Sequence, residues 1–525
     1  MSQSLGSGSF DNLSALLDNS ETMSVELLTQ LLHRAATRPD ARAVIECRWS
    51  SEGADRVQMA SWTYAELAAA IANRAQWFVD QTPEDGVILL ALPNGFDFTA
   101  TFLAVLAAGR TIFPVSGQLA PAELILAARK AGVSVAFVPD VQTTPLSEIN
   151  GIQCHDIGTW AGAVDKGAMF DPEPARSSGM YLLSSGTTAM PRIVDRRADA
   201  LDAVARNIAH QVGGANHPRL LPEDRVLAVI PQCHSYGVES ALMGPIHAGA
   251  CLVLCQGFDP LLVRELWRRG HVSVFPATPT MLDMLARMGG TATSPGDDGV
   301  RSQPCVYSAG AILPASVVRA FEQRFGASIG QLYGASEAGS VTFISGDERP
   351  DPTCVGLPFP EINVRIVEPD GEHLTDVSAG AEGEVVIRAP SMFSRYVGDR
   401  DDCTTDGYWR SGDLGRYDAQ GKLHITGRLK LLIDVGPEKV NPLEVESALR
   451  DHPAVAECVV KPVPVTETVC RLRAVVVVAA GAAATAEELR LFLRDRLSAY
   501  KVPRVFEFRT DFPRSATGKV LRREI

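Results

Sequence analysis

Several features that would place a protein in a membrane, outside the cell or on nucleic acid are missing from this sequence. The longest apolar run, from Ala474 to Thr485, falls short of the ~20 residues that span a bilayer, so no membrane span is expected. The residues from Met1 to Phe10 have neither a basic start nor an apolar core, which argues against a secretory signal. A formal net charge of −13 argues against nucleic acid as a partner.

Cysteine patterns that bind zinc or form a disulfide framework are also missing. The ten cysteines are scattered, and the pair nearest in sequence, Cys251 and Cys255, has strand-like neighbours instead of a CxxC arrangement. Buried thiols in a reducing compartment fit this pattern, so we expect a cytoplasmic location. The GxxxxGK[ST] spacing of a Walker loop is absent as well, which excludes a phosphate loop of that kind.

The bulk composition is that of a globular protein with more than one structural unit. With 525 residues, the chain exceeds the length at which one hydrophobic core stops growing, so about two to four units are expected. Hydrophobic residues make up 46% and charged residues 21% of the chain, proportions that argue against disorder.

Hydrophobic periodicity predicts helices and buried strands in the first two thirds of the chain. Apolar spacing predicts helices over 24–38 and 63–80, and Thr63 with Glu66 forms a capping box at the start of the second. Short apolar runs separated by helical stretches indicate buried parallel strands of an α/β layer. These runs are Val87–Leu92, Val133–Val138, Val226–Ile230, Cys251–Leu254 and Val272–Phe275.

The pattern changes to strand-like alternation from about residue 355 and changes again after Arg428. Alternation over Asn363–Val367, Gly383–Arg388 and Leu423–Thr426 predicts a β-rich region. Beyond it, the pattern predicts a helix from Pro442 to Leu449, a strand at Val475–Ala479 and a helix at Ala486–Leu497.

The predicted fold class is α/β with two domains. A large N-terminal domain, residues 1–428, has layered α/β sheets and a β-rich subdomain at about 355–428. A small, mobile α+β domain, residues 429–525, follows it.

One tract carries a signal for phosphate binding. The segment Tyr181-Leu-Leu-Ser-Ser-Gly-Thr-Thr-Ala-Met-Pro-Arg192 predicts a strand that opens into a loop. Its hydroxyl groups are donors, its glycine lets backbone N–H groups approach closely, and its arginine brings positive charge to a polyanion. The residues concerned are Ser184, Ser185, Gly186, Thr187, Thr188 and Arg192. A solvated loop is the alternative that composition alone favours.

Four further segments follow this tract, and the ordered set is more specific than any one of them. They are Pro231–Gly237, Gln331–Glu337, Tyr408–Gly415 continued by Gly427–Arg428, and Pro513–Lys519. Together with the tract they resemble the adenylate-forming (ANL) superfamily: acyl- and aryl-CoA synthetases, the adenylation domains of peptide synthetases, and firefly luciferase. The resemblance runs from about residue 25 to the C-terminus.

The chemistry of such enzymes shows why these residue types are needed. A carboxylate attacks the α-phosphate of ATP while pyrophosphate leaves, so positive charge must face the charge that develops. Mg²⁺ bridging the phosphates needs a carboxylate ligand, and Glu337 is the natural candidate, with an exposed loop acid as the alternative. Asp413, expected on a turn, is suited to accept both ribose hydroxyls.

The resemblance implies roles for residues that the chemistry alone does not assign. Ser336 would touch the α-phosphate, and Tyr333 would stack on adenine. Gly310 and Ala311 would line the base, and Arg428 would contact ribose or phosphate. Lys519, the catalytic lysine, would bridge the carboxylate and α-phosphate oxygens on a domain that rotates at the hinge residue Lys430, with Gly436 and Lys439 guiding the thiol. On their own, Arg428 and Lys519 would be ordinary surface cations.

The segment around His234 bears on the substrate. No acidic residue stands there to bind an α-ammonium group, which favours a plain carboxylic acid over an amino acid. The segment resembles that of dihydroxybenzoate and salicylate ligases, although those have Asn where Ser235 stands. The implied acyl pocket is lined by His234, Ser235, Tyr236, Gly237, Ala309 and Gly334, whose small members would leave room for a bulky acid. A satisfied core imidazole is the alternative for His234.

We therefore expect an ATP- and Mg²⁺-dependent ligase that forms an acyl-AMP and transfers the acyl group to a thiol. The chain ends at Ile525, so the acceptor is expected to be separate: CoA as co-substrate, or alternatively the phosphopantetheine of a separate acyl carrier protein. The pattern leaves the oligomeric state open.

Two other hypotheses stay open on the sequence. The first is oxidative use of the adenylate, as in luciferases. The second is a nucleotide-binding pseudoenzyme, because Ala189 stands where the family usually has Gly and Arg192 where it usually has Lys. The segment from Leu431 to Glu438 also departs from the family pattern. Retention of Glu337, Asp413 and Lys519 argues against the pseudoenzyme.

Overall fold

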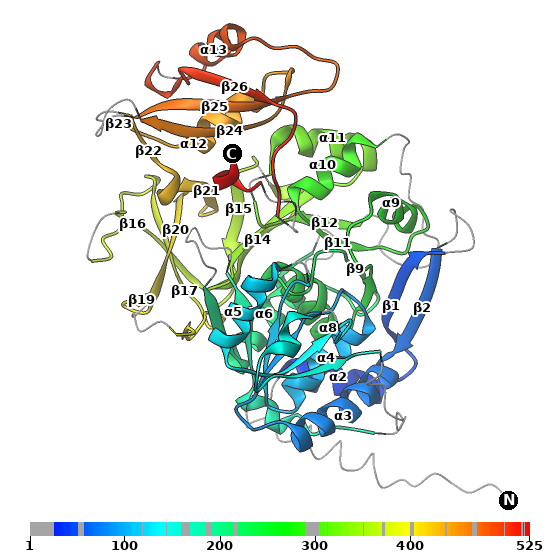
Figure 1. Cartoon of the computed structure of the whole chain (residues 1–525). Coiled ribbons are helices and arrows are strands. Elements are labelled where there is room, and N and C mark those ends of the chain that lie inside the picture. The colour runs from blue at the N-terminus through cyan, green and yellow to red at the C-terminus, as the bar shows by residue number, and fades with distance from the viewer. Residues whose placement is uncertain are drawn as a thin grey trace, which may run out of the picture.

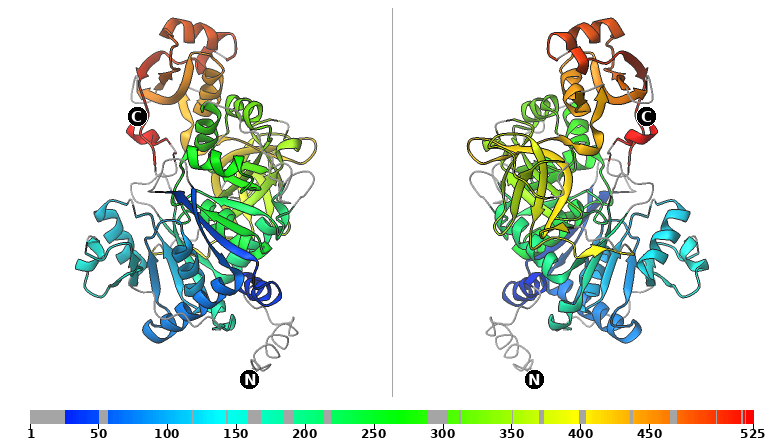
Figure 2. Two further views of the ribbon diagram at one scale, coloured as in Figure 1. Left: turned by 90° about the vertical axis from the view of Figure 1, so that its right-hand side faces the viewer. Right: turned by 90° about the vertical axis from the view of Figure 1, so that its left-hand side faces the viewer.

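The fold is known from a computed structural model. It describes residues 26–50, 57–117, 119–142, 144–158, 168–184, 192–213, 219–288, 304–311, 313–349, 351–369, 373–398, 404–435, 438–464, 470–497, 499–515, 518 and 520–525. For Lys430 and Lys439 the description covers the backbone alone. Figures 1 and 2 show a large body with the orange and red C-terminal elements stacked at one end of it.

The described chain opens with two helices that flank a hairpin. Helix α2 (Glu26–Thr37) precedes the antiparallel strands β1 (Arg42–Trp49) and β2 (Val57–Thr63), and α3 (Tyr64–Gln81) follows. The predicted capping box is confirmed, because Thr63 Oγ1 accepts from the backbone N–H of Glu66 and the Glu66 carboxylate accepts from that of Thr63. Both predicted helices therefore form, with their ends within two residues of the expected positions.

A seven-stranded sheet carries the hydroxyl tract. Within the described residues its order is β18-β8-β7-β4-β3-β5-β6, and β3 (Val87–Leu90) lies parallel to β4 (Thr111–Pro114) and β5 (Val133–Val138). The other strands are β6 (Gln153–Asp156), β7 (Gly179–Leu183), β8 (Ile193–Arg197) and β18 (Arg395–Tyr396). The helices between them are α4 (Phe96–Ala107), α5 (Pro121–Ala131), η1 (Pro145–Glu148), η2 (Glu173–Ser177) and α6 (Ala198–Gln211).

A 14-stranded sheet forms the second layer of the described chain. Its parallel part comprises β9 (Arg225–Ala228), β10 (Cys251–Leu254), β11 (Val274–Ala277), β12 (Cys305–Ser308) and β13 (Ile329–Ala335). Helices α7 (Ser235–Val238), η3 (Glu239–Met243), α8 (Gly244–Ala248), α9 (Pro260–Arg268), α10 (Pro279–Arg287) and α11 (Ala315–Phe325) connect these strands. The predicted parallel strands are confirmed, but they are divided between the two sheets.

The β-rich region continues the larger sheet. Strand β15 (Cys354–Pro358) pairs with β14 (Gly339–Ile344) on one side and with β21 (Leu423–Arg428) on the other. The remaining elements are η4 (Gly346–Glu348), β16 (Asn363–Val367), β17 (Gly383–Arg388), β19 (Thr404–Thr405) and β20 (Tyr408–Tyr417). The predicted strands are confirmed, but burial does not alternate along them, since β17 is buried continuously from Gly383 to Ile387.

The C-terminal elements have a core of their own. Buried residues of this core include Val440, Val445, Leu449, Leu472 and Leu489. The elements are η5 (Leu429–Leu431), β22 (Ile433–Val435), β23 (Glu438–Val440), α12 (Pro442–Arg450), β24 (Val455–Pro464), β25 (Cys470–Val478), α13 (Ala486–Arg494), η6 (Ala499–Lys501), β26 (Val505–Arg509) and η7 (Arg522–Glu524). The two predicted helices and the strand between them are confirmed, whereas β24 and β26 carried no sequence prediction.

The described residues bear on membrane-spanning helices and on disulfides. No described helix is both long enough and apolar enough to cross a membrane. Among the described cysteines, eight form no disulfide, and seven of these are buried.

Candidate functional site

The two ends of the hydroxyl tract lie on paired strands of the smaller sheet. Strand β7 pairs antiparallel with β8, and the backbone N–H of Ser184 donates to the carbonyl of Arg192 at 2.9 Å, which brings these two ends together. The predicted strand is confirmed. Among the described residues, the buried Oγ of Ser184 has no hydrogen-bond partner. The other predicted phosphate-contacting residues, Ser185, Gly186, Thr187 and Thr188, lie outside the described residues, as does Ala189.

Arg192 reaches the predicted metal ligand through a tyrosine that the sequence did not single out. The Arg192 guanidinium lies 4.7 Å from the ring centroid of Tyr396, and the Tyr396 hydroxyl donates to Oε1 of Glu337 at 3.1 Å. Strand β18, which carries Tyr396, pairs with β8 just beyond the tract. Burial, and then the Glu337 charge, raises the pKa of Tyr396, so its hydroxyl stays a donor. No motif marks Tyr396, because its position depends on pairing with a strand about 200 residues earlier.

Ser336 and Glu337 lie in a tight turn between β13 and β14. The backbone N–H of Ala338 donates to the carbonyl of Ala335 at 3.2 Å, and that of Phe393 donates to the Glu337 carbonyl at 2.8 Å. The Ser336 hydroxyl lies 3.2 Å from that of Ser235, which begins α7. The turn therefore brings the segment 331–337 against the segment 231–237.

Tyr333, Asp413 and Arg428 form a second, contiguous group. The Tyr333 hydroxyl donates to Oδ2 of Asp413 at 2.8 Å, and Arg428 Nε lies 2.6 Å from Oδ1. The Asp413 charge, acting against burial, raises the pKa of Arg428. Burial, and then the same carboxylate, raises the pKa of Tyr333 well above its usual value. Each oxygen of the buried Asp413 carboxylate therefore has one donor, the Tyr333 hydroxyl on Oδ2 and the Arg428 guanidinium on Oδ1.

The expectation that Asp413 stands on a turn is wrong. Asp413 lies inside β20, directly opposite Arg428 in the register with β21, and is 3% exposed. The Ser-Gly-Asp-Leu sequence has the composition of a turn, and Gly412 does adopt a φ of +71°, but Asp413 and Leu414 pair across the sheet with Arg428 and Gly427. Each carboxylate oxygen has a second lone pair, so acceptance of ribose hydroxyls stays geometrically open.

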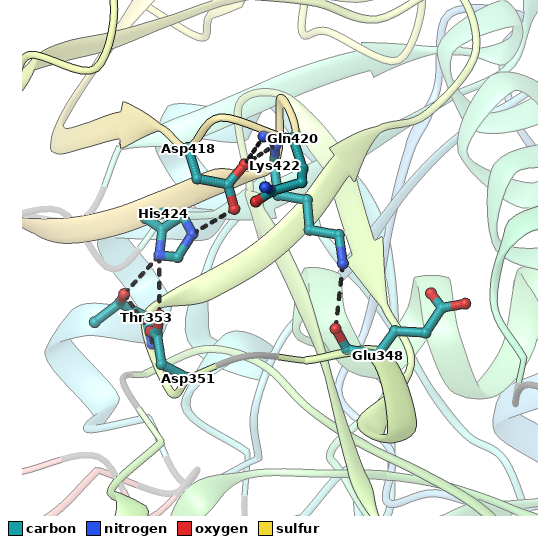
Figure 3. Close-up of polar contacts among 7 residues, drawn as sticks. All are labelled: Glu348, Asp351, Thr353, Asp418, Gln420, Lys422 and His424. Carbon is teal, nitrogen blue, oxygen red and sulfur yellow. Dashed lines mark hydrogen bonds and ion pairs between the residues drawn. The ribbon is translucent and has the colours of Figure 1, made fainter.

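The buried His424, in β21, joins the β20–β21 turn to the residues before β15 (Figure 3). His424 Nε2 lies 3.1 Å from Oδ2 of Asp418, and Nδ1 lies 2.9 Å from Thr353 Oγ1. Thr353 Oγ1 donates its own proton to Asp351 at 2.6 Å, so it accepts from Nδ1, while the Asp418 carboxylate accepts from Nε2. His424 therefore links the β20–β21 turn to the residues before β15 through both ring nitrogens.

The residues predicted to line the acyl pocket differ in what surrounds them. His234 caps the start of α7; its Nε2 is buried with no partner among the described residues, and burial lowers its pKa, so the ring is neutral. Tyr236 donates to the carbonyls of Ala277 and Tyr307 at 3.1 and 3.3 Å, which ties α7 to the sheet.

The small residues predicted for that pocket are surrounded by backbone. A Cβ on Gly237 would lie 2.3 Å from the Pro231 carbonyl, and one on Gly334 would lie 2.3 Å from the Gly339 carbonyl. Glycine at these positions therefore permits close backbone packing and leaves no vacant volume. Ala309 is buried, whereas a Cβ on Gly310, whose φ is +84°, would meet nothing within 4 Å. Ala311 follows it and is exposed.

The residue before Lys519 contacts helix α10. Lys519 itself lies outside the described residues, but Thr280 Oγ1, in α10, donates to the carbonyl of Gly518 at 3.2 Å. At the predicted hinge, Lys430 lies in η5, and Asn441 Nδ2 donates to the carbonyl of Thr426 at 2.8 Å. Of the predicted thiol-guiding residues, Gly436 lies outside the described residues, and Lys439 stands in β23 with only its backbone described.

These contacts join the predicted segments into one region. Arg192, Glu337 and Ser336 connect the tract, the turn and the segment 231–237, and β13 continues from that turn to Tyr333 and its partners on β20 and β21. Among the described residues, no cluster of His, Cys, Asp or Glu could bind a metal ion by itself. A cation here would therefore need ligands from a substrate as well as from Glu337.

Two family models match most of the chain. The AMP-binding enzyme family matches residues 31–397, and the AMP-binding enzyme C-terminal domain matches residues 444–519. Benzoate–CoA ligase of Thauera aromatica is 30% identical over 490 residues, covering 88% of this chain and 90% of the relative. Long-chain-fatty-acid–CoA ligase of Bacillus subtilis (strain 168) is 33% identical over 309 residues, covering 58% of this chain and 54% of the relative.

The fold also has solved counterparts. ATP-bound MatB from Rhodopseudomonas palustris superposes with a TM-score of 0.84 at 22% identity, covering 96% of this chain and 98% of that one. This similarity confirms the predicted α/β architecture with a small C-terminal domain. The chain belongs to the AMP-binding, adenylate-forming (ANL) enzyme family, and it is an AMP-forming acid–thiol ligase.

Proposed function

We propose that this ligase activates an aromatic carboxylic acid with ATP and transfers the acyl group to CoA. In the first step a carboxylate oxygen bonds to the α-phosphorus while the bond to the leaving pyrophosphate breaks. In the second, the sulfur of CoA bonds to the acyl carbon and AMP leaves. The observation that carries the proposal is the unbroken series of contacts from Arg192 through Glu337 and Ser336 to Ser235.

Glu337 is proposed as the protein ligand of Mg²⁺. Its Oε1 accepts from Tyr396, and among the described residues no hydrogen bond reaches Oε2. One carboxylate together with substrate phosphates and water is the coordination that Mg²⁺ prefers. The ion would neutralise phosphate charge during transfer. Tyr396 fixes the orientation of the carboxylate, and Arg192 holds positive charge on the same side.

The adenosine part is proposed to bind between Asp413 and Gly310. Asp413 is anchored by Tyr333 and Arg428, so its remaining lone pairs point in fixed directions for two ribose hydroxyls. The open space beside Gly310 supports a position for the base between residues 310–311 and the Tyr333 ring.

An aromatic acid is proposed on two grounds. The segment 231–237 has no acid, and the neutral His234 offers an uncharged, buried nitrogen at the start of α7. The similarity to benzoate–CoA ligase covers 88% of this chain, whereas the similarity to long-chain-fatty-acid–CoA ligase covers 58%. Both relatives are named for CoA, which supports CoA over a carrier protein as the acceptor.

The C-terminal domain, residues 429–525, is proposed to act as a lid with its hinge near Lys430. The hydrogen bond from Thr280 Oγ1 to the Gly518 carbonyl holds the residue before Lys519 against α10, which supports this as the arrangement for adenylation. Rotation for thioester formation would break this bond and present Gly436 and Lys439 to the thiol. Thr280→Val should therefore slow adenylation and spare thioester formation from supplied acyl-AMP; equal loss in both half-reactions would contradict the lid assignment.

A cytoplasmic location is proposed, supported by the described cysteines that form no disulfide and are mostly buried. The function itself is tested by acid-dependent pyrophosphate release, measured with benzoates and with fatty acids, with and without CoA. Release with benzoates and formation of a CoA thioester are expected. Preference for fatty acids would contradict the aromatic assignment, and release without a CoA thioester would revive the carrier-protein alternative.

A further inference from the structure

Behind the turn that carries Ser336 and Glu337 lies an ion pair that no motif predicts. Arg196, in β8, is 0% exposed, and Glu239, the first residue of η3, is 2% exposed. Arg196 Nη1 lies 2.7 Å from Glu239 Oε1. Buried charges are costly even when paired, so such a pair is weak evidence for stability alone. Its remaining contacts indicate what else it does.

Each member of the pair holds one end of the turn. Arg196 Nη2 donates to the carbonyl of Ala335 at 3.1 Å, and Ser340 Oγ donates to Glu239 Oε2 at 2.7 Å. Ala335 ends β13 and Ser340 lies in β14, so residues 336–339 span the interval between these two contacts. The ion pair therefore fixes both ends of the segment that contains Ser336 and Glu337.

The guanidinium also fits closely against the turn itself. Gly339 has φ of +76°, and a Cβ there would lie 3.3 Å from Arg196 Nη2. The carbonyl of Ala335 accepts from both the guanidinium and the N–H of Ala338. Movement of the turn toward β8 would bring Gly339 into collision with Arg196. Movement away from β8 would break the hydrogen bond from Arg196 Nη2 to the Ala335 carbonyl.

The pair joins three segments that the proposed reaction uses. Arg196 lies in β8, which begins directly after Arg192, the last residue of the hydroxyl tract. Glu239 directly follows α7, which begins at Ser235, and Ser235 contacts Ser336 at 3.2 Å. One buried ion pair thus sets the phosphate tract, the acid-side helix and the turn relative to one another.

We propose that Arg196 and Glu239 are positioning residues for adenylation: they hold the turn so that the Glu337 carboxylate and the Ser336 hydroxyl face the phosphates. The inference rests on the proposed function of those two residues. Both side chains are buried, so they would act on the reaction through the turn. Loss of the pair should act on turnover and on the Mg²⁺ requirement, with little change in the KM for the acid.

The test separates positioning from stability by removing one charge or both. Arg196→Met and Glu239→Gln each leave a buried charge without its partner, so each should lower Tm as well as kcat. The double variant removes both charges, and a glutamine still accepts from Ser340. It should regain much of the lost Tm. Its kcat should stay about 10- to 100-fold low, because misplacement by about 1 Å costs about 100-fold. Its half-saturating Mg²⁺ concentration should be raised.

Arg110→Met is the matched control. Arg110 is 7% exposed and donates to the carbonyls of Thr82 and Ala108, but it precedes the N-terminal end of β4, whereas the tract follows the C-terminal end of the parallel strand β7. This variant should lose Tm while the Mg²⁺ dependence and kcat of its folded fraction stay at the wild-type values.

The outcomes distinguish this inference from the proposed function. A double variant that regains wild-type kcat along with Tm, or one that keeps wild-type Mg²⁺ dependence, would overturn the positioning role while the wild type remains active. A wild type that neither binds MgATP by calorimetry nor releases pyrophosphate would overturn the proposed function, and the inference with it.

Discussion

Replacement of Asp413 by Asn is the most informative single test of the nucleotide site. The Asp413 carboxylate accepts from the Tyr333 hydroxyl at 2.8 Å and pairs with Arg428 Nε at 2.6 Å. An asparagine has nearly the same shape but offers one acceptor oxygen and one NH₂ group, so a donor faces either Arg428 or Tyr333. The change therefore removes charge and acceptor capacity without opening a cavity.

The expected magnitudes differ for folding and for binding. The Arg428 side chain is 50% exposed, so its lost ion pair is worth no more than about 1 kcal/mol, and the whole cost to the free energy of unfolding is about 1–2 kcal/mol. A hydrogen bond from a ribose hydroxyl to a charged acceptor contributes about 1.5–3 kcal/mol. At about 1.4 kcal/mol per tenfold, the Kd for ATP should rise about 10- to 100-fold.

The assay compares ATP affinity and thermal unfolding for Asp413→Asn with those of Asp376→Asn. Asp376 pairs with Arg365 Nε at 2.9 Å on the surface of the same β-rich region and has no place in the site. The control should change neither quantity appreciably. An unchanged Kd for ATP in Asp413→Asn would refute the ribose assignment, and a Kd increase shared by the control would show that the effect is not specific to the site.

Three further predictions concern Tyr396, His424 and Gly334. Tyr396→Phe removes the donor to Glu337, so kcat for pyrophosphate release should fall about tenfold and more Mg²⁺ should be needed; an unchanged Mg²⁺ titration would contradict this. Although burial opposes it, hydrogen bonds from the Lys422 backbone and His424 lower the pKa of Asp418. The ionised Asp418 carboxylate therefore stabilises the folded state above the pKa of an unfolded Asp, about 3.9. This contribution to the free energy of unfolding is lost as the pH falls through the lower pKa of the folded state. Denaturant unfolding measured below about pH 4 should show that the free energy of unfolding falls less steeply with pH in His424→Gln than in the wild type. Equal slopes would contradict a stabilising contact between His424 and Asp418. Gly334→Ala would place a Cβ 2.3 Å from a backbone carbonyl, so Tm should drop even with saturating ATP, whereas a normal Tm would show that the strand can move.

Local features of the chain could be predicted because neighbouring residues determine them. The capping box of Thr63 and Glu66 needs contacts only three residues apart, and the apolar runs at Val87 and Val133 are buried whichever sheet receives them. The ordered segments also indicated the family, since phosphate and carboxylate chemistry requires those residue types. Their spacing does not show how the segments meet.

Tertiary structure alone decided the contacts that cross the chain. Tyr396 reaches Glu337 because β18 pairs with β8, and Asp413 is extended because β21 lies opposite it. The Arg196–Glu239 pair joins residues 43 positions apart through the packing of a strand against a helix. The sequence by itself determined which residue types carry the chemistry and which local elements form. Strand pairing and burial, which depend on long-range free energy and not on local propensity, decided which of those residues touch.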